Sequence, residues 1–323
     1  MAKSEKIPKN FALTGVAGYI TPRHLKAIKE TGNKLIAALD PHDSVGILDS
    51  YFPEAKFFTE FERFDRYLDK LRRQNGEHFI HYVSICSPNY LHDAHVRFAL
   101  RIKANAICEK PLVLNPWNLD ALEELERENR KKVYNILQLR VHPSLVSLKN
   151  KIKKDKRNKK HQVRLTYITS RGSWYLNSWK GQIEKSGGLA TNIGIHFFDL
   201  LIWMFGTVKK NEVHYSSPQK TCGFLELNKA EVQWYLSIDK DDLPNNIKHK
   251  GQSTYRSLVI DAKEVEFSNG FTDLHTIVYK NILKEKGFRI KDVRPSIILA
   301  YNIRNASITG PNTNTHPLGL KLK

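Results

Sequence analysis

The sequence predicts an α/β protein that begins with a Rossmann-type, doubly wound parallel sheet and continues as an α+β domain with an open, mostly antiparallel sheet. Strand-like and helix-like segments alternate through the first 140 residues, a glycine turn follows the first strand, and longer alternating strands dominate after residue 140. A chain of 323 residues is long enough for two domains. We therefore expect one domain over residues 1–140 and another over 141–323.

The first domain follows from repeated strand–helix units. Asn115 and Pro116 suit the start of one helix, as cap and first helical residue. The expected strands cover 11–16, 34–40, 78–87, 105–111 and 133–140, and the expected helices cover 21–32, 90–102 and 115–130.

The second domain has longer alternating strands and a single very apolar helix among them. Alternation of this kind indicates an antiparallel sheet covered by helices on one face. The expected strands cover 162–174, 212–217, 221–228, 230–239 and 255–268, and the expected helices cover 194–206, 272–285 and 294–307.

Composition narrows the class of protein. The hydrophobic content is 41%, and no uninterrupted apolar run approaches the roughly 18 residues that span a bilayer. The first ten residues offer no apolar stretch for secretion, so we expect a cytoplasmic protein without a membrane span. Three scattered cysteines, Cys86, Cys108 and Cys222, are too few for a metal cage or disulfide framework, so we expect buried thiols and no metal site.

The net charge of +19 would suit a partner rich in phosphate. The densest basic stretch, residues 149–161, has Ile152 as its only apolar anchor and no interleaved aromatic residue for base stacking. We interpret it as a solvated helix face and loop, and expect no nucleic-acid partner.

A glycine turn joins the first strand to its helix. In a dinucleotide fold one glycine makes the tight turn, a second admits the pyrophosphate, and a third lets helix and strand pack closely. Gly15 fills the first position, Ala17 stands at the second with Gly18 beside it, and residues 19–21 contain no glycine. Alone, this broken pattern fits a structural turn as well as a nucleotide site.

Asp40 ends the second strand and favours the nucleotide interpretation. A carboxylate there accepts hydrogen bonds from the adenosine ribose and repels a 2′-phosphate, so NAD is favoured over NADP. The alternative is that Asp40 only caps the loop before Pro41.

Two later strand ends carry further candidates, because ligands of doubly wound sheets bind beyond the carboxyl ends of the strands. Residues 87–89 form a turn, and His92 follows on the first turn of a helix. Lys110 follows the next strand, between a glutamate and a proline, where a nicotinamide ring would lie. A solvated surface lysine is the alternative.

The apolar helix of the second domain carries polar residues at helical spacing. Asn192, His196 and Asp199 share one helix face or a turn leading into it, after the paired glycines Gly187 and Gly188. A histidine on such a helix is as readily a satisfied core residue as a catalyst.

These motifs together resemble the Gfo/Idh/MocA family of NAD(P)-dependent oxidoreductases, over nearly the whole chain. The Glu-Lys-Pro run at 109–111 and the block SGGLATNIGIHFFDLL at 186–201 are the specific signatures. The stretches at 15–28, 171–181 and 269–276 resemble a narrower branch, the UDP-N-acetyl-2-amino-2-deoxy-D-glucuronate 3-dehydrogenases of O-antigen (lipopolysaccharide) sugar biosynthesis. The family implies a Rossmann domain and an open-faced sheet domain that binds substrate and builds dimers or tetramers.

The resemblance also implies residue roles. Lys110 would hydrogen-bond the reacting hydroxyl, and His196 would be the general acid/base. Asn192 stands where many family members carry aspartate, which argues against a His–Asp pair. The candidate cofactor-binding residues are Gly15, Ala17, Gly18, Tyr19, Ile20, Asp40, His42, Ser87, Pro88, Asn89, His92, Glu109 and Lys110.

A nucleotide-linked uronic acid carries a diphosphate and a carboxylate, so its site needs cations. The stretch 171–181 supplies two, with aromatic side chains that could pack on a sugar or belong equally to the core. The candidate substrate-binding residues are Lys110, Arg171, Trp174, Tyr175, Lys180, Asn192 and His196.

The predicted function is NAD-dependent oxidation of the 3-hydroxyl of UDP-N-acetylglucosaminuronate to the 3-keto sugar, by a homo-oligomer that we expect to be a tetramer. A 2-oxo acid such as 2-oxoglutarate is the candidate hydride acceptor. One alternative keeps the fold and changes the substrate to another sugar, an inositol or another nucleotide sugar. A second is a non-catalytic Rossmann protein that senses nucleotide or binds nucleic acid.

Overall fold

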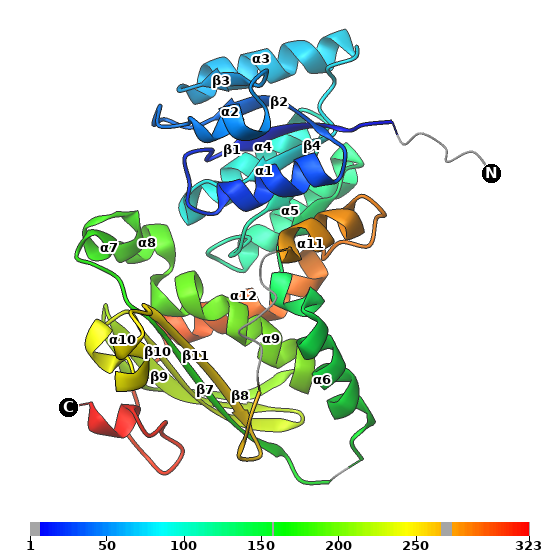
Figure 1. Ribbon diagram of the computed structural model, residues 1–323. Coiled ribbons are helices and arrows are strands. Elements are labelled where there is room, and N and C mark those ends of the chain that lie inside the picture. The colour runs from blue at the N-terminus through cyan, green and yellow to red at the C-terminus, as the bar shows by residue number, and fades with distance from the viewer. Residues whose placement is uncertain (1–6, 157, 266–272, 323) are drawn as a thin grey trace. The chain divides into compact units, whose positions relative to one another are not determined.

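The computed structural model describes residues 7–156, 158–265 and 273–322, and it divides into two compact units (Figure 1). Unit 1 contains Met1–Val113, Trp117–Gln138 and Thr272–Asp292, and unit 2 contains Leu114–Pro116, Leu139–Phe271 and Val293–Lys323. The division after residue 138 lies close to the expected boundary at 140. The segment 272–292 was not expected in unit 1, because it returns there from the second half of the chain.

Unit 1 is built on a parallel sheet with the strand order β3-β2-β1-β4-β5-β6. This is the order of a Rossmann fold, and it reverses between β1 and β4, where such sheets bind their ligands. The fold class predicted for this half is confirmed. The strands are β1 (Asn10–Thr14), β2 (Lys34–Leu39), β3 (Lys56–Phe58), β4 (Tyr82–Ile85), β5 (Asn105–Cys108) and β6 (Val133–Asn135).

The helices of unit 1 are held by apolar stripes, as in α3, which buries Phe64, Leu68 and Leu71. Helix α11 packs beside α1 although the two lie at opposite ends of the chain (Figure 1). The helices are α1 (Thr21–Glu30), α2 (Ile47–Tyr51), α3 (Phe61–Gln74), α4 (His92–Arg101), α5 (Trp117–Asn129) and α11 (Leu274–Ile282), with a 3₁₀ turn at Asn89–Leu91.

Unit 2 contains a mixed sheet in the order β12-β11-β7-β10-β9-β8, parallel only between β7 and β10. This confirms the mostly antiparallel sheet. The strands are β7 (His161–Thr169), β8 (Val208–Ser216), β9 (Lys220–Leu227), β10 (Ala230–Ser237), β11 (Thr254–Ile260) and β12 (Lys263–Glu264). The helices are α6 (Pro143–Lys154), α7 (Trp174–Asn177), α8 (Ile183–Ser186), α9 (Ile195–Phe205), α10 (Asn245–His249) and α12 (Ile290–Asn305), with short helical turns at Gln138–Val141, Trp179–Gly181, Ala190–Gly194, Lys240–Asp242 and Gly319–Lys321.

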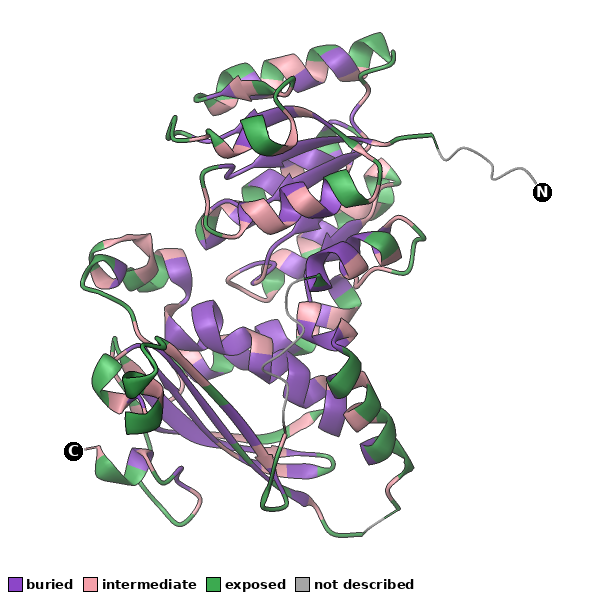
Figure 2. Cartoon of the chain, in the orientation of Figure 1, coloured by how far each residue is buried: buried purple, intermediate pink, exposed green. Residues whose placement is uncertain are grey.

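Helices α6, α9 and α12 share one core with the sheet of unit 2, and Figure 2 shows how completely α9 is buried. Helix Ile183–Phe205, which includes α9, is long and apolar enough to cross a membrane, with a mean hydropathy of 1.4. However, 83% of its most apolar window is buried inside the protein, so it is the core helix of unit 2. This is the very apolar helix expected over 194–206, and no membrane span was expected there because polar residues interrupt its apolar run.

Many expected strands are shorter in the structure; in unit 1 the strand expected over 78–87 covers Tyr82–Ile85 and the one expected over 133–140 covers Val133–Asn135, and in unit 2 two strands end at turns. The strand expected over 162–174 ends at Thr169, and the chain then turns into α7. The strand expected over 255–268 turns at Asp261 and Ala262, whose φ angles of 49° and 63° lead into β12. Residues 266–268 of that strand, and 269–272 of the branch-specific stretch, lie outside the described residues.

Candidate active site

The glycine turn of unit 1 requires glycine at its first position. Gly15 has φ +82°, and a Cβ atom there would lie 2.5 Å from the carbonyl carbon of Cys86 and 2.6 Å from the backbone nitrogen of Ser87. The hydroxyl of Thr21 donates to Gly15 O at 2.6 Å and closes the turn. Gly15 therefore brings β1 and the end of β4 into close contact at the switch point.

The same turn presents backbone donors at the start of α1. Ile20 is the N-cap of this helix and has no capping side chain. Within the described part of the chain, the N–H groups of Tyr19 and Ile20 make no hydrogen bond. Tyr19 is 91% exposed. Open N–H groups at a helix N-terminus suit a pyrophosphate, so the turn fits a dinucleotide despite its missing glycines.

Asp40 holds this turn from the end of β2. Its Oδ2 accepts from Ala17 N–H and its Oδ1 from the N–H of the exposed His42, both at 3.0 Å. Asp40 thus caps its own loop, the alternative left open above. Two bonds do not exhaust a carboxylate, which accepts about four, so Asp40 retains capacity for ribose hydroxyls.

The turn after β4 is linked to the loop after β5 by His92. The buried ring of His92 lies between Pro111 O, 2.6 Å from Nδ1, and Ser87 O, 2.8 Å from Nε2. Ser87 Oγ lies 2.9 Å from Nδ1 of His95, and burial lowers the pKa of His95 to about 4. Pro88 and the buried Asn89 complete this turn. The candidates at both strand ends therefore form one connected edge.

Glu109 and Lys110 face different surroundings at the end of β5. Lys110 is partly exposed. Glu109 is buried, and its Oε1 lies 2.9 Å from Nε2 of His24 and 3.1 Å from Nε2 of His275. The Glu109 carboxylate is therefore buried inside unit 1 and bonded to two histidines, and its contact with a cofactor stays a prediction.

The catalytic candidates of unit 2 lie where a π-helical turn, Ala190–Gly194, leads into α9. The buried Asn192 donates to the hydroxyl of Tyr175 at 2.5 Å, and burial raises the pKa of Tyr175. Tyr175 is 2% exposed, so it holds Asn192 within the core and offers no open ring face. His196 is partly exposed on a helix that is otherwise almost entirely buried, so its side chain reaches the surface of unit 2.

The cationic candidates of unit 2 precede this turn. Arg171 is exposed. The ammonium of Lys180 lies 5.3 Å and 4.4 Å from the ring centroids of Trp174 and Trp179, and burial together with Arg171 lowers its pKa. Trp174 is 53% exposed, which leaves it available to a ligand. Of the aromatic candidates here, the structure therefore assigns Tyr175 to the core and Trp174 to the surface.

Some residues near these candidates were missed by sequence reasoning. Arg140 forms a bidentate, buried ion pair with Asp199, at 2.8 Å and 2.7 Å. His24 and His275 were missed as well, and with Glu109 they form a group able to hold a metal ion. The apolar helix around Asp199 was a usable signal, since a buried carboxylate requires a partner.

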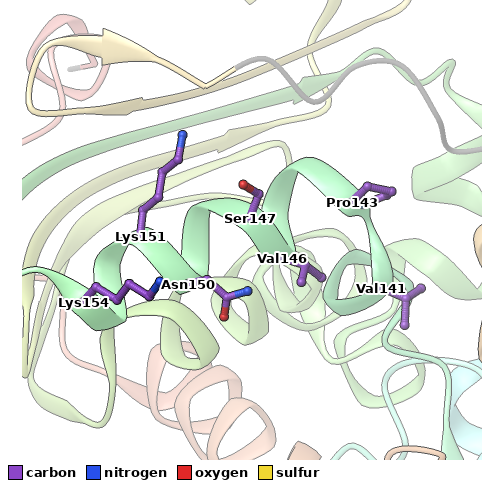
Figure 3. A pocket seen from close by; sticks show the side chains of 7 residues that line it. All are labelled: Val141, Pro143, Val146, Ser147, Asn150, Lys151 and Lys154. Atoms are coloured by element: carbon purple, nitrogen blue, oxygen red, sulfur yellow. The ribbon is translucent and has the colours of Figure 1, made fainter.

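A surface pocket of about 630 Å³ lies along α6 in unit 2, and none of the predicted site residues lines it (Figure 3). Lys151, Lys153 and Lys154 of this helix are exposed and Ile152 is buried, as expected for a solvated basic face, whereas Lys149 is partly buried with its ammonium 4.0 Å from the ring centroid of Trp203. The pocket is lined by Val141, Pro143, Val146, Ser147, Asn150, Lys151 and Lys154.

A Rossmann unit with a lysine at a strand end, followed by an α/β unit with a histidine on its core helix, suits the class of two-domain, dinucleotide-dependent oxidoreductases. Comparison of the sequence with models of protein families supports this class. Residues 9–136 match the oxidoreductase family model of the NAD-binding Rossmann fold, and residues 149–241 match its C-terminal alpha/beta domain. The chain belongs to the Gfo/Idh/MocA oxidoreductase family, which confirms the predicted family and cofactor NAD.

Comparison with solved structures identifies proteins within this family that are similar to the chain. The WlbA (WbpB) dehydrogenase of Thermus thermophilus, in complex with NAD and alpha-ketoglutarate, is 51% identical, with a TM-score of 0.92 over 96% of this chain and 99% of that chain. Its complex with NAD and UDP-GlcNAcA has a TM-score of 0.91 over the same shares. The WlbA dehydrogenase of Bordetella pertussis is 16% identical over 92% of this chain and 95% of its own, with a TM-score of 0.74, which supports the fold alone.

Proposed function

We propose that this enzyme oxidises the 3-hydroxyl of UDP-N-acetylglucosaminuronate with NAD⁺ to give the 3-keto sugar. The observation that carries the proposal is 51% identity, over nearly the full length, to a dehydrogenase that binds NAD and UDP-GlcNAcA. The open N–H groups at the start of α1 and the carboxylate of Asp40 suit that cofactor. Neither alternative function is favoured by a comparison.

The proposed reaction needs a hydride acceptor, a hydrogen-bond donor to the reacting oxygen and a base. Bound NAD⁺ supplies the hydride acceptor. Lys110 donates a hydrogen bond to the 3-hydroxyl and stabilises negative charge as it develops on that oxygen. His196 accepts the hydroxyl proton, a task that suits imidazole because its unperturbed pKa lies near neutral pH. Arg171 and Lys180 balance the charges of the diphosphate and carboxylate.

We further propose that 2-oxoglutarate regenerates NAD⁺, as the bound alpha-ketoglutarate of the Thermus thermophilus enzyme suggests. We expect a homotetramer in the cytoplasm, and the three cysteines, all free and buried, suit a reducing compartment. Light scattering coupled to size-exclusion chromatography measures the oligomer size.

The direct test is turnover. Enzyme, NAD⁺ and UDP-N-acetylglucosaminuronate are incubated with and without 2-oxoglutarate, and the 3-keto sugar is measured by mass spectrometry. Product in the presence of the acceptor supports the proposal, and no product under both conditions contradicts it. Thermal shifts with the unlinked sugar and with inositol test the alternative substrates. Lys110→Ala and His196→Ala should each abolish turnover.

A further inference from the structure

We propose that His24 and His275 are positioning residues for Lys110, acting through the buried carboxylate of Glu109. The inference rests on the proposed function, in which Lys110 contacts the reacting hydroxyl. It assigns a role to α11, the segment that returns from the second half of the chain to unit 1.

The geometry fixes the Glu109 carboxylate from both sides. Its Oε1 accepts a hydrogen bond from Nε2 of His24 on α1 at 2.9 Å and another from Nε2 of His275 on α11 at 3.1 Å. Its Oε2 accepts from the backbone N–H of Lys110 at 3.2 Å. His24 and His275 are 0% and 1% exposed, so water does not replace either donor. The two histidines therefore act on Lys110 through a single carboxylate.

The hydrogen bonds of His24 place its protons consistently, whereas the buried Nδ1 of His275 has no hydrogen-bond partner within the described residues. Both imidazoles donate from Nε2, so Nδ1 of His24 is an acceptor, and the hydroxyl of Tyr279 lies 2.7 Å from it. Ser84 Oγ lies 2.7 Å from the same hydroxyl and can donate to it. The chain Ser84–Tyr279–His24–Glu109 thus runs from β4 through α11 and α1 to the lysine, with every donor matched to an acceptor.

The charges agree with this arrangement. Burial alone would raise the pKa of Glu109, but hydrogen bonds from His24 and His275 hold that pKa well below its usual range. Burial lowers the pKa of His24. We therefore assign an ionised carboxylate to Glu109, which accepts hydrogen bonds from imidazole N–H groups. The same atoms could ligate a divalent cation, whose ligands would lie about as far apart, so the metal content of the purified enzyme tests that alternative.

Hydrogen bonds of the backbone hold the strand end at Glu109 independently of the Glu109 side chain. Glu109 N–H donates to Ile85 O at 3.0 Å. Asn135 Nδ2 donates to Cys108 O and Glu109 O, at 2.9 Å and 3.1 Å. These bonds hold the strand end itself. Without the imidazoles, the buried carboxylate would lack two donors and would turn toward water, which removes the acceptor from Lys110 N–H.

The test compares His275→Leu, which removes the donor, with His275→Gln, whose amide N–H reaches a similar point. For His275→Leu and Glu109→Gln we expect kcat to fall at least about 10-fold, with KM and the NAD⁺ dissociation constant within about twofold. His275→Gln should restore most of kcat. His161→Leu is the matched control, because His161 is also buried and its Nδ1 lies 2.8 Å from a carboxylate oxygen of Asp261 in unit 2.

A second readout does not depend on the sugar. The holoenzyme is labelled with an amine-reactive reagent over a pH series, and Lys110 is quantified by peptide mass spectrometry. We expect the labelling midpoint of Lys110 to move to lower pH in Glu109→Gln, because a neighbouring negative charge is lost, and to move little in His275→Gln.

These readouts separate the two proposals. If wild-type enzyme fails to oxidise the UDP-sugar, the proposed function fails and the labelling still tests the positioning role. Unchanged kcat and unchanged labelling in His275→Leu and Glu109→Gln would overturn that role. An equal loss in His275→Gln and His275→Leu, or stoichiometric zinc in the purified enzyme, would also overturn it.

Discussion

Gly15 shows how one backbone angle and one close approach fix a cofactor turn. Gly32 also has a positive φ, of +72° against +82° at Gly15, but an added Cβ atom at Gly32 would meet nothing within 4 Å, whereas one at Gly15 would lie 2.5 Å from backbone. Gly32→Ala should cost about 1 kcal/mol of unfolding free energy, from backbone strain alone. Gly15→Ala should cost more and weaken NAD⁺ binding at least about 10-fold, as urea unfolding and calorimetry would measure. Equal effects of the two substitutions would contradict the steric role of Gly15.

Asp40 supports the same turn by accepting from Ala17 N–H, and it carries the predicted preference for NAD. Asp40→Ala should weaken NAD⁺ binding about 10-fold and reduce the discrimination against NADP⁺, because both the turn and the charge change. Fluorescence titration with each nucleotide measures this. Asp43→Ala, at an exposed position of the same loop, is the control. An unchanged NAD⁺/NADP⁺ ratio in Asp40→Ala would leave Asp40 as a loop cap only.

At the scale of elements, the ion pair Arg140–Asp199 anchors α9 one turn beyond His196. The side chains of this pair are 8% and 4% exposed, so loss of Arg140 would leave a buried, poorly compensated carboxylate. Arg140→Met should lower the free energy of unfolding by about 3–5 kcal/mol and reduce kcat. Guanidinium unfolding and steady-state kinetics measure both.

The matched variant for this pair is Arg140→Met combined with Asp199→Leu. Removal of both charges should recover much of the lost stability, because no unpaired charge then remains in the core. A double variant as unstable as Arg140→Met would contradict this account of α9.

For the whole molecule, buried neutral histidines predict loss of stability in acid. Burial lowers the pKa of His95 to about 4 and that of His316 to about 3, against an ordinary value of 6.5. As the pH falls, these histidines therefore bind protons at a higher pH in the unfolded chain than in the folded protein. The stabilisation is complete above pH 6.5 and is lost as the pH falls toward 4, with His95 alone contributing about 3 kcal/mol.

Urea unfolding at pH 8, 6 and 5 checks this dependence. His95→Gln should flatten the decline between pH 6 and 5, since it removes one titrating group. A free energy of unfolding that stays constant over this range would contradict the neutral state of these histidines.

The sequence predicted features that depend on local pattern. The alternation of strands and helices, the turn at Gly15, Asp40 at the end of β2 and Lys110 after β5 are all where they were expected. Each of these positions can be predicted from a short stretch of sequence. The carboxyl ends of the strands of a parallel sheet lie along one edge, independent of the length of the loops between them.

The sequence did not predict contacts that join distant segments. His24 and His275 meet Glu109 across sequence separations of 85 and 166 residues, and neither histidine lies in a periodic pattern that marks a site. The sequence did not decide whether Tyr175 packs in the core or contacts a ligand, because aromatic side chains are common in both places. Its 2% exposure follows only from the packing of unit 2.

The central claim, hydride transfer from carbon 3 of the UDP-sugar, is tested most directly with substrate deuterated at that carbon. After incubation with enzyme, NAD⁺ and 2-oxoglutarate, mass spectrometry follows the label. The account predicts loss of deuterium from the 3-keto sugar and one deuterium in the reduced nicotinamide or, after recycling, at carbon 2 of 2-hydroxyglutarate. A sugar that is oxidised with its carbon-3 deuterium retained, or that is not oxidised at all, would contradict it.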